Sequence, residues 1–324
     1  MKIFYLLLLA VFMSSCQQKP AQTASPVPSA VVIPDFSADS AYTFIADQVA
    51  FGPRIPDTDA HRRCAVYLVN RLQAAGATVH EQPFQARAFN GKVLNGVNII
   101  GSFNTAASKR ILLFAHWDTR PWSDHDPDPA NYNTPVTGAN DGASGVGVLL
   151  EVARQLGLKS PQVGVDIVFF DAEDYGAPES WQGNQQHTWC LGSQHWSRNP
   201  HQPGYKASFG ILLDMVGAPG ASFYREQISE HFAMDIVNKV WSAAHRLGHQ
   251  RYFINAPGGS ITDDHLYVNQ LAGIPSVNII QYDPNSEKGF GAYWHTINDT
   301  MENIDRNTLH AVGTTVLSVI YNES

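Results

Sequence analysis

Continuous apolar runs alternate along the chain with stretches in which apolar residues recur every three or four positions. Helical spacing predicts helices over residues 41–54, 59–77, 142–157, 229–247 and 307–321. The apolar runs predict buried strands at NGVNIIGSF (95–103), RILLFAHWD (110–118), GVDIVFFDAED (164–174), SFGILLDMVGA (208–218) and IPSVNIIQYD (274–283). Buried strands separated by helices indicate an α/β fold: a mostly parallel central β-sheet flanked by helices on both faces, in three layers.

The first 37 residues follow a different pattern. Lys2 precedes an apolar run over 3–13 that is too short to span a membrane, which predicts a signal peptide over 1–15. The residues MSSC resemble a bacterial lipoprotein box and imply lipidation of Cys16; the alternative is an ordinary cleaved signal peptide with a chance cysteine. Residues 16–37, rich in Pro, Ser, Ala and Gln, predict a disordered tether. We therefore expect an exported, periplasmic or cell-envelope lipoprotein of a bacterium.

Composition limits the size of the fold and the class of partner. Of 324 residues, 44% are apolar and 15% charged, which suits one large α/β domain over 38–324 better than two small ones. The net charge of -8 and the lack of a Lys/Arg run argue against nucleic acid and anionic membrane surfaces as partners. We expect a monomer that meets the membrane only through a lipid on Cys16.

Cysteine usage excludes one kind of metal site. The chain has three cysteines and no CxxC or Cys/His cluster, so zinc-finger chemistry is excluded. With Cys16 lipidated, Cys64 and Cys190 either form one disulfide or remain two buried thiols, and both outcomes are open. Any metal site must use carboxylates and histidines.

Acidic and imidazole side chains gather where the predicted strands end. Because the carboxyl ends of parallel strands meet at one edge of a sheet, where ligands bind, we expect these residues to lie close together. Closely spaced carboxylates repel one another unless a cation or shared protons offset the charge. Separate solvated loop acids would fit each residue alone but not the set. The residues are His116, Asp118, Asp171, Glu173, Asp174, Asp214 and Asp283.

The types of these donors indicate the metal. Carboxylates with histidine and without thiolate suit catalytic Zn²⁺, which takes three protein ligands and keeps one open position. Mg²⁺ and Ca²⁺ prefer oxygen ligands and would not require histidine. The sequence therefore predicts a catalytic zinc site.

Six short motifs occur in one order with fitting separations. They resemble the zinc aminopeptidase clan and, within it, the glutaminyl-peptide cyclotransferases of the animal-like type found also in some bacteria. The resemblance covers roughly residues 40–324. The motifs are AHWDT (115–119), TGANDGASG (137–145), FFDAED (169–174), LLDMVGA (212–218), TDDH (262–265) and YWHT (293–296).

The resemblance implies a role for individual residues. One zinc per chain would be bound by Asp141, Asp174 and His295, and Glu173 would be the general acid/base. Asp214 and Asp264 match two further acids that hydrogen-bond around the catalytic Glu, and Trp294 matches a pocket tryptophan. His116 ligates a second metal in dinuclear aminopeptidases but is present without being a ligand in single-zinc cyclases, so it is left out of the metal set.

An insertion distinguishes the cyclase branch from the aminopeptidase branch. Residues 175–191, YGAPESWQGNQQHTWCL, resemble a cyclase loop that carries a pocket tryptophan; Trp181 is the first candidate and Trp189 the second. Core packing is the plainer interpretation of these tryptophans. Two departures from the family are Asp174, where Glu is usual, and Ala115 and Val146, which replace the cysteines that pair in animal enzymes.

The activity implied by the resemblance is that of a zinc-dependent glutaminyl cyclase, an acyltransferase. Such an enzyme converts the N-terminal glutamine of peptides or proteins to pyroglutamate and releases ammonia. A di-zinc aminopeptidase of the same clan is the alternative, and metal stoichiometry separates the two. A non-catalytic binding lipoprotein with the same fold is a third possibility, which predicts broken ligands.

Overall fold

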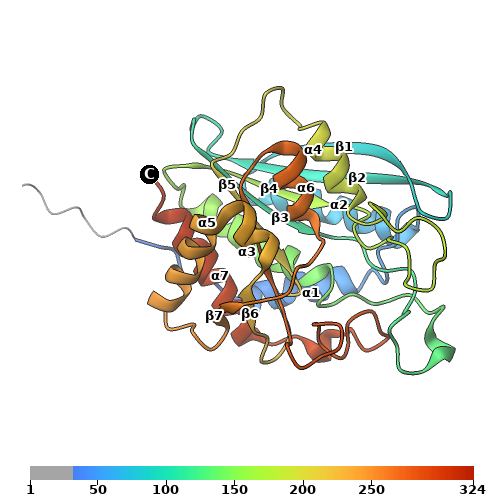
Figure 1. The fold of residues 1–324 in the computed structure, drawn as a ribbon. Coiled ribbons are helices and arrows are strands. Elements are labelled where there is room, and N and C mark those ends of the chain that lie inside the picture. Colours follow the sequence, from blue (N-terminus) through green and yellow to red (C-terminus); the bar gives the residue numbers. More distant parts are fainter. Residues whose placement is uncertain (1–31) are drawn as a thin grey trace, which may run out of the picture. The chain divides into compact units, whose positions relative to one another are not determined.

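The computed structural model describes residues 32–324, which fold around a six-stranded sheet (Figure 1). The predicted signal peptide, Cys16 and most of the predicted tether lie outside the described residues. Within residues 32–324, no helix has the length and apolar character needed to cross a membrane.

The sheet has the strand order β1-β2-β4-β3-β5-β8. Its four strands from β4 to β8 run parallel and are buried almost throughout, whereas β1 and β2 form an antiparallel hairpin, with β2 also antiparallel to β4. The predicted mostly parallel sheet is therefore confirmed. The strands are β1 (Thr78–Arg87), β2 (Val93–Phe103), β3 (Arg110–His116), β4 (Gly164–Phe170), β5 (Phe209–Asp214) and β8 (Ser276–Ile280).

Helices cover both faces of the sheet, as predicted. One face packs against α1 (Ala38–Val49), α2 (Asp59–Ala74), α3 (Ala143–Leu158), α5 (Gln227–Arg246) and α7 (Arg306–Tyr321). The other face carries a smaller core under α4 (Leu191–Arg198) and the π-turn Val268–Ala272, which continues α6 (Asp264–Tyr267). Figure 1 shows α4 and α6 on the side of the sheet away from α1, α3 and α7. A separate two-stranded sheet pairs β6 (Phe223–Arg225) with β7 (Phe253–Pro257), and 3-10 turns occupy Pro129–Asn131 and Met301–Asn303.

Differences from the predicted elements have local causes. Helix α1 ends at Val49, five residues before the predicted end, because Gly52 adopts a left-handed φ of 88° and Pro53 follows it. Strand β1 was not predicted, because most of its side chains are exposed and it therefore lacks a continuous apolar run. Cys64 and Cys190 are both buried and are not joined by a disulfide.

Helix α3 approaches the sheet closely where Gly145 crosses β5. A Cβ atom at Gly145 would overlap the carbonyl oxygen of Leu213 and lie 3.0 Å from the Cβ of Ala115. Only glycine permits this contact, and the contact sets the position of the turn that precedes α3.

We expect Gly145→Ala to lower the free energy of unfolding by at least about 2 kcal/mol, because overpacking against rigid backbone outweighs the better helix propensity of alanine. Urea-induced unfolding measures this change. Gly183→Ala is the matched control, since its new methyl would meet only the exposed ring of Trp181 and should change stability by less than about 0.5 kcal/mol. Equal stability of the two variants would contradict the packing argument.

Candidate active site

The carboxyl ends of three adjacent parallel strands supply most of the predicted polar rim. His116 ends β3, Glu173 and Asp174 follow β4, and Asp214 ends β5. Because β4, β3 and β5 are neighbours in the sheet, these side chains share one edge.

Asp283 does not join this rim, and its inclusion was wrong. It lies in the loop after β8 and accepts the N–H of Asn285, which caps its own turn. The chain leaves the sheet edge before this point, since Tyr282 N–H already bonds to the carbonyl of Ser222.

Three buried residues from separate loops form a group able to hold a metal ion. Asp141, Asp174 and His295 each offer one ligand atom, and these atoms lie within 4.8 Å of one another. His295 Nε2 is 3.1 Å from Asp174 Oδ1 and 3.4 Å from Asp141 Oδ2. Asp174 Oδ2 is buried without a hydrogen-bond partner among residues 32–324, as expected of an oxygen that serves as a metal ligand. Two carboxylates and one imidazole fit catalytic Zn²⁺.

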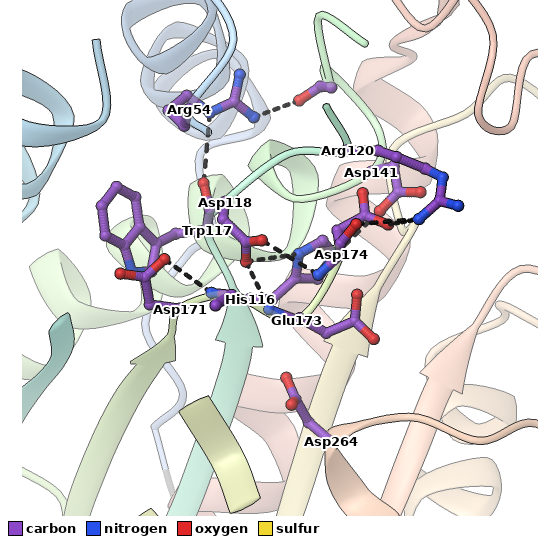
Figure 2. A network of polar contacts seen from close by, with 12 residues as sticks. Arg54, His116, Trp117, Asp118, Arg120, Asp141, Asp171, Glu173, Asp174 and Asp264 are labelled. Carbon is purple, nitrogen blue, oxygen red and sulfur yellow. Dashed lines mark hydrogen bonds and ion pairs between the residues drawn. The ribbon is translucent and has the colours of Figure 1, made fainter. Parts of the chain in front are cut away.

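Two further carboxylates hold the backbone that carries these ligands. Asp118 accepts the N–H groups of Glu173 at 3.0 Å and Asp174 at 3.1 Å, as Figure 2 shows. Asp299 accepts the N–H groups of Asn140 at 2.7 Å and Asp141 at 2.9 Å. Burial, with the nearby charge of Asp141, raises the pKa of Asp299 to about 7. Asp299 was not among the predicted site residues, although its place four residues after His295 was a usable signal.

Two buried arginines, Arg54 and Arg120, bind backbone carbonyl groups of the loops that carry the metal ligands. The guanidinium of Arg54 donates to the carbonyls of Thr137 and Gly138, both at 2.6 Å, in the turn before Asp141. Arg120 donates to the carbonyl of Asp174 at 3.1 Å. These fixed cations counter part of the negative charge of the rim.

His116 takes part in a second group that shares Asp141. Its Nε2 atom lies 3.0 Å from Asp141 Oδ1 and 3.3 Å from Asp214 Oδ1, and all three residues are buried. Burial lowers the pKa of His116, but hydrogen bonds to the three surrounding carboxylates raise it well above its ordinary value. The site therefore offers donors for a second cation beside the first group.

Glu173 lies on the pocket wall beside the metal group, with its side chain largely buried. Burial raises the pKa of Glu173 well above its ordinary value, and the charges of Asp174 and Asp263 add to this effect. The thiol of Cys190 donates to Glu173 Oε1 at 3.1 Å. A carboxyl group with a raised pKa beside a metal group is suited to accept and return a proton.

The two further predicted acids are placed differently from one another. Asp214 lines the pocket, and burial, with the charge of Asp263, raises its pKa to about 7. Asp264, the first residue of α6, is fully buried, and neither of its oxygens has a hydrogen-bond partner among the described residues. The charge of Asp264 contributes to the raised pKa of Glu173, and its predicted hydrogen bond around Glu173 stays a prediction.

Asp263 lines the pocket where Asp264 was expected to contribute. Asp263 caps α6 and offers an oxygen within 4.8 Å of donor atoms of Glu173 and Cys190. The motif TDDH contains both acids, and the sequence could not tell which one faces the pocket because the direction of a capping side chain depends on the packing of the helix.

A cavity of about 440 Å³ opens beside the metal group. Trp294 stacks on the ring of His295 with centroids 3.9 Å apart, and Trp189 lies parallel to the same ring at 5.9 Å. Both tryptophans line the cavity, together with residues 259–263, Tyr282 and residues 286–290. The size is ordinary for a small-molecule or short-peptide site.

The preference for Trp181 over Trp189 as the pocket tryptophan was wrong. Trp181 does not line the cavity; it is 36% exposed and packs edge-on against Phe89. Trp189 is drawn inward because the next residue, Cys190, donates its N–H to the carbonyl of Glu173. Arg120 also lies over the Trp189 ring at 4.5 Å.

We expect Asp118→Asn to lower zinc affinity by about 10- to 100-fold, because an amide cannot accept both N–H groups that position Asp174. Competition with a chromogenic chelator measures the affinity independently of any activity. Asp128→Asn is the control, since Asp128 caps a short turn away from the ligands. Wild-type affinity in Asp118→Asn would contradict the positioning role.

Known proteins share this fold and much of this sequence. A zinc-dependent exopeptidase from Parabacteroides distasonis is 58% identical, with a TM-score of 0.89, and the alignment covers 90% of this chain and 100% of that one. A glutaminyl cyclase from Tannerella forsythia is 59% identical, with a TM-score of 0.88 and the same coverage. A bovine glutaminyl-peptide cyclotransferase is 26% identical over 294 residues, which is 79% of this chain and 74% of that protein.

The model of peptidase family M28 matches residues 98–320. This range contains the three residues of the metal group, Glu173 and both pocket tryptophans. The family match and the similarity to a zinc-dependent exopeptidase support zinc as the metal. The resemblance to the zinc aminopeptidase clan is thereby confirmed. Because the match spans well over half of the chain, the protein belongs to peptidase family M28.

Proposed function

We propose that this protein converts the N-terminal glutamine of peptides or proteins to pyroglutamate and releases ammonia, with one zinc ion. The observation that carries the proposal is the pocket in which Trp189 and Trp294 flank the metal group and the buried carboxyl of Glu173. Trp189 belongs to the insertion that resembles the cyclase branch. The identity of 59% to a protein described as a glutaminyl cyclase supports the same assignment.

The metal group provides the electrophilic part of this site. Asp141, Asp174 and His295 would hold Zn²⁺, which when bound supplies a Lewis acid for the side-chain carbonyl oxygen of the substrate glutamine. Asp118 and Asp299 hold the backbone of the ligands in place, and neither residue lines the cavity.

Glu173 moves the proton. The α-amine nitrogen forms a bond to the side-chain carbonyl carbon, and the bond from that carbon to the amide nitrogen breaks. Glu173 takes a proton from the amine and delivers it to the departing nitrogen, so that ammonia leaves and the five-membered lactam closes. Asp263 lies close to Glu173, and its charge raises the pKa of both Glu173 and Asp214, which favours a state in which these buried acids share protons.

The pocket contributes orientation and excludes water. Ring closure is intramolecular, so the gain in reaction rate comes from holding the α-amine against the side-chain carbonyl carbon. Trp189 and Trp294 narrow the space beside the metal group. Water, which an aminopeptidase needs as its nucleophile, is not consumed in the cyclisation.

A di-zinc aminopeptidase is the second candidate, favoured by the group formed by His116, Asp141 and Asp214. The resemblance to a protein described as a zinc-dependent exopeptidase also favours it. Two zinc ions per chain would support this candidate, and one would support the cyclase.

The cellular setting belongs to the proposal as well. We propose export to the bacterial envelope, lipidation of Cys16 and a monomeric state, all of which rest on the sequence pattern. The substrates would then be peptides or proteins of the envelope or of the medium.

Incubation of the purified protein with a Gln-initiated dipeptide tests the function directly. We expect ammonia and a pyroglutamyl dipeptide with the peptide bond intact, as seen by mass spectrometry. A Leu-initiated dipeptide is the parallel substrate, and metal content is measured on the same sample. Release of free amino acids with two zinc ions per chain would overturn the proposal in favour of the aminopeptidase.

We expect Glu173→Gln to keep zinc and to lose about two to four orders of magnitude in turnover, the usual range for general acid/base catalysis. Steady-state kinetics on the Gln-initiated dipeptide, together with metal analysis, checks both halves of the prediction. Glu287→Gln is the matched control, because Glu287 lines the same cavity at its exposed rim. Normal turnover by Glu173→Gln would show that another group carries the proton.

A further inference from the structure

Glu226 is a buried carboxylate outside the metal group and the pocket lining. It is 2% exposed and precedes α5 as its N-cap. Five donors bond to it: the N–H groups of Ile228 at 2.8 Å and Ser229 at 2.6 Å, the hydroxyl of Ser229 at 2.8 Å, the N–H of Ile261 at 3.0 Å and Nε2 of His265 at 3.0 Å.

These contacts exceed what a helix cap requires. Helices α1 and α2 are capped by Ser37 and Thr58, each of which accepts a backbone N–H from the first turn of its own helix. Glu226 does the same for α5 but also binds two groups, on Ile261 and His265, that are 35 and 39 residues away. Burial raises the pKa of Glu226, but the hydrogen bond and charge of His265, with the backbone N–H groups, lower it to about 2.

The first distant contact holds one wall of the substrate pocket. Residues 259–262 line the cavity and form no helix or strand. Besides the bond from Ile261 to Glu226, the N–H of Gln227 donates to the carbonyl of Gly259 at 3.0 Å, and its side-chain amide donates to the carbonyl of Gly258 at 2.9 Å. The position of the wall therefore depends on the first residues of α5.

A chain of hydrogen bonds continues from Glu226 to Asp263. The hydroxyl of Ser229, which donates to Glu226, accepts the N–H of Asn278 at 2.9 Å. The side-chain amide of Asn278 then donates to Asp263 Oδ2 at 2.6 Å. His265, two residues after Asp263, contacts Glu226 directly, with its Nε2 atom 3.0 Å from Glu226 Oε2.

We propose that Glu226 is a positioning residue for the substrate pocket, which fixes both the wall at residues 259–262 and the carboxylate of Asp263 beside Glu173. This inference rests on the proposed function for its kinetic consequences. Glu226 touches neither metal ligands nor the cavity, so it acts through Ser229, Asn278 and the wall.

Two variants test the inference on the zinc-loaded protein with a Gln-initiated dipeptide. Glu226→Gln offers one acceptor oxygen in place of two and turns an amide N–H₂ toward donors. Ser229→Ala keeps the backbone cap and removes only the hydroxyl link to Asn278. Small misplacements of active-site groups lower the reaction rate by up to about 100-fold. We therefore expect kcat to fall by about 10- to 100-fold in Glu226→Gln and by less in Ser229→Ala. We expect KM to rise in Glu226→Gln only, and the zinc content to stay unchanged in both variants.

Glu230→Gln is the matched control, because Glu230 lies in the first turn of the same helix and pairs with Arg225 away from the pocket. A double-mutant cycle with Asp263→Asn adds a readout that a purely structural role would not move. If Glu226 acts through Asp263, the loss in kcat from Glu226→Gln shrinks at least threefold when Asp263 is already replaced. Fully additive losses, or wild-type kinetics with only a lower melting temperature, would overturn the inference.

Hydrogen exchange separates this outcome from failure of the proposed function. In Glu226→Gln we expect faster amide exchange in a peptide that contains residues 258–263 and unchanged exchange in α7, whatever reaction the enzyme catalyses. Absence of pyroglutamate formation by the wild-type protein would overturn the function alone. Unchanged exchange over residues 258–263 would overturn the positioning role alone.

Discussion

Four backbone hydrogen bonds to two buried carboxylates hold the metal group together. Asp118 receives consecutive N–H groups from the segment of Asp174, and Asp299 receives consecutive N–H groups from the segment of Asp141. A buried carboxyl group is costly unless hydrogen-bond donors compensate it, and each of these two accepts a pair of backbone N–H groups. Through this pairing the chain brings together ligands that would otherwise repel one another.

Left-handed backbone in the loops that follow β4, β5 and β8 completes the arrangement. Ala172, Met215 and His295 have φ values of 54°, 47° and 52°, and Cys190 has 59°. Such conformations cost about 1 to 3 kcal/mol each in residues other than glycine, and they persist where the surroundings hold them. The turn at Ala172 aims the next two side chains away from the strand. Asp174 thereby comes within 3.1 Å of His295 although it is one methylene shorter than the Glu usual in the family.

The pocket is built from parts that the sheet does not supply. Trp189 comes from the inserted loop and is anchored through the bond from Cys190 to Glu173. The opposite wall, residues 259–262, has no regular structure and depends on the start of α5. The sheet edge therefore places the metal donors, while loops tied to it by a few buried polar contacts shape the space for the substrate. Loops at a fixed sheet edge can therefore change the space for a substrate without moving the metal donors.

Local pattern by itself predicted the parallel strands, the helices, most of the polar rim and the kinds of metal donor, carboxylate and imidazole. The individual ligands Asp141, Asp174 and His295 were implied by the resemblance to a known family. Hydrophobic periodicity reports burial within one element, and the strand ends of an α/β sheet meet at one edge for topological reasons. Tertiary structure alone decided that Asp263 and not Asp264 lines the pocket, that Trp189 and not Trp181 faces His295, and that Asp283 turns away. The physical reason is that neighbouring residues of the same type give the same signal in the sequence and differ only in where their side chains point. Direction is set by caps, left-handed turns and hydrogen bonds to residues far away in the sequence.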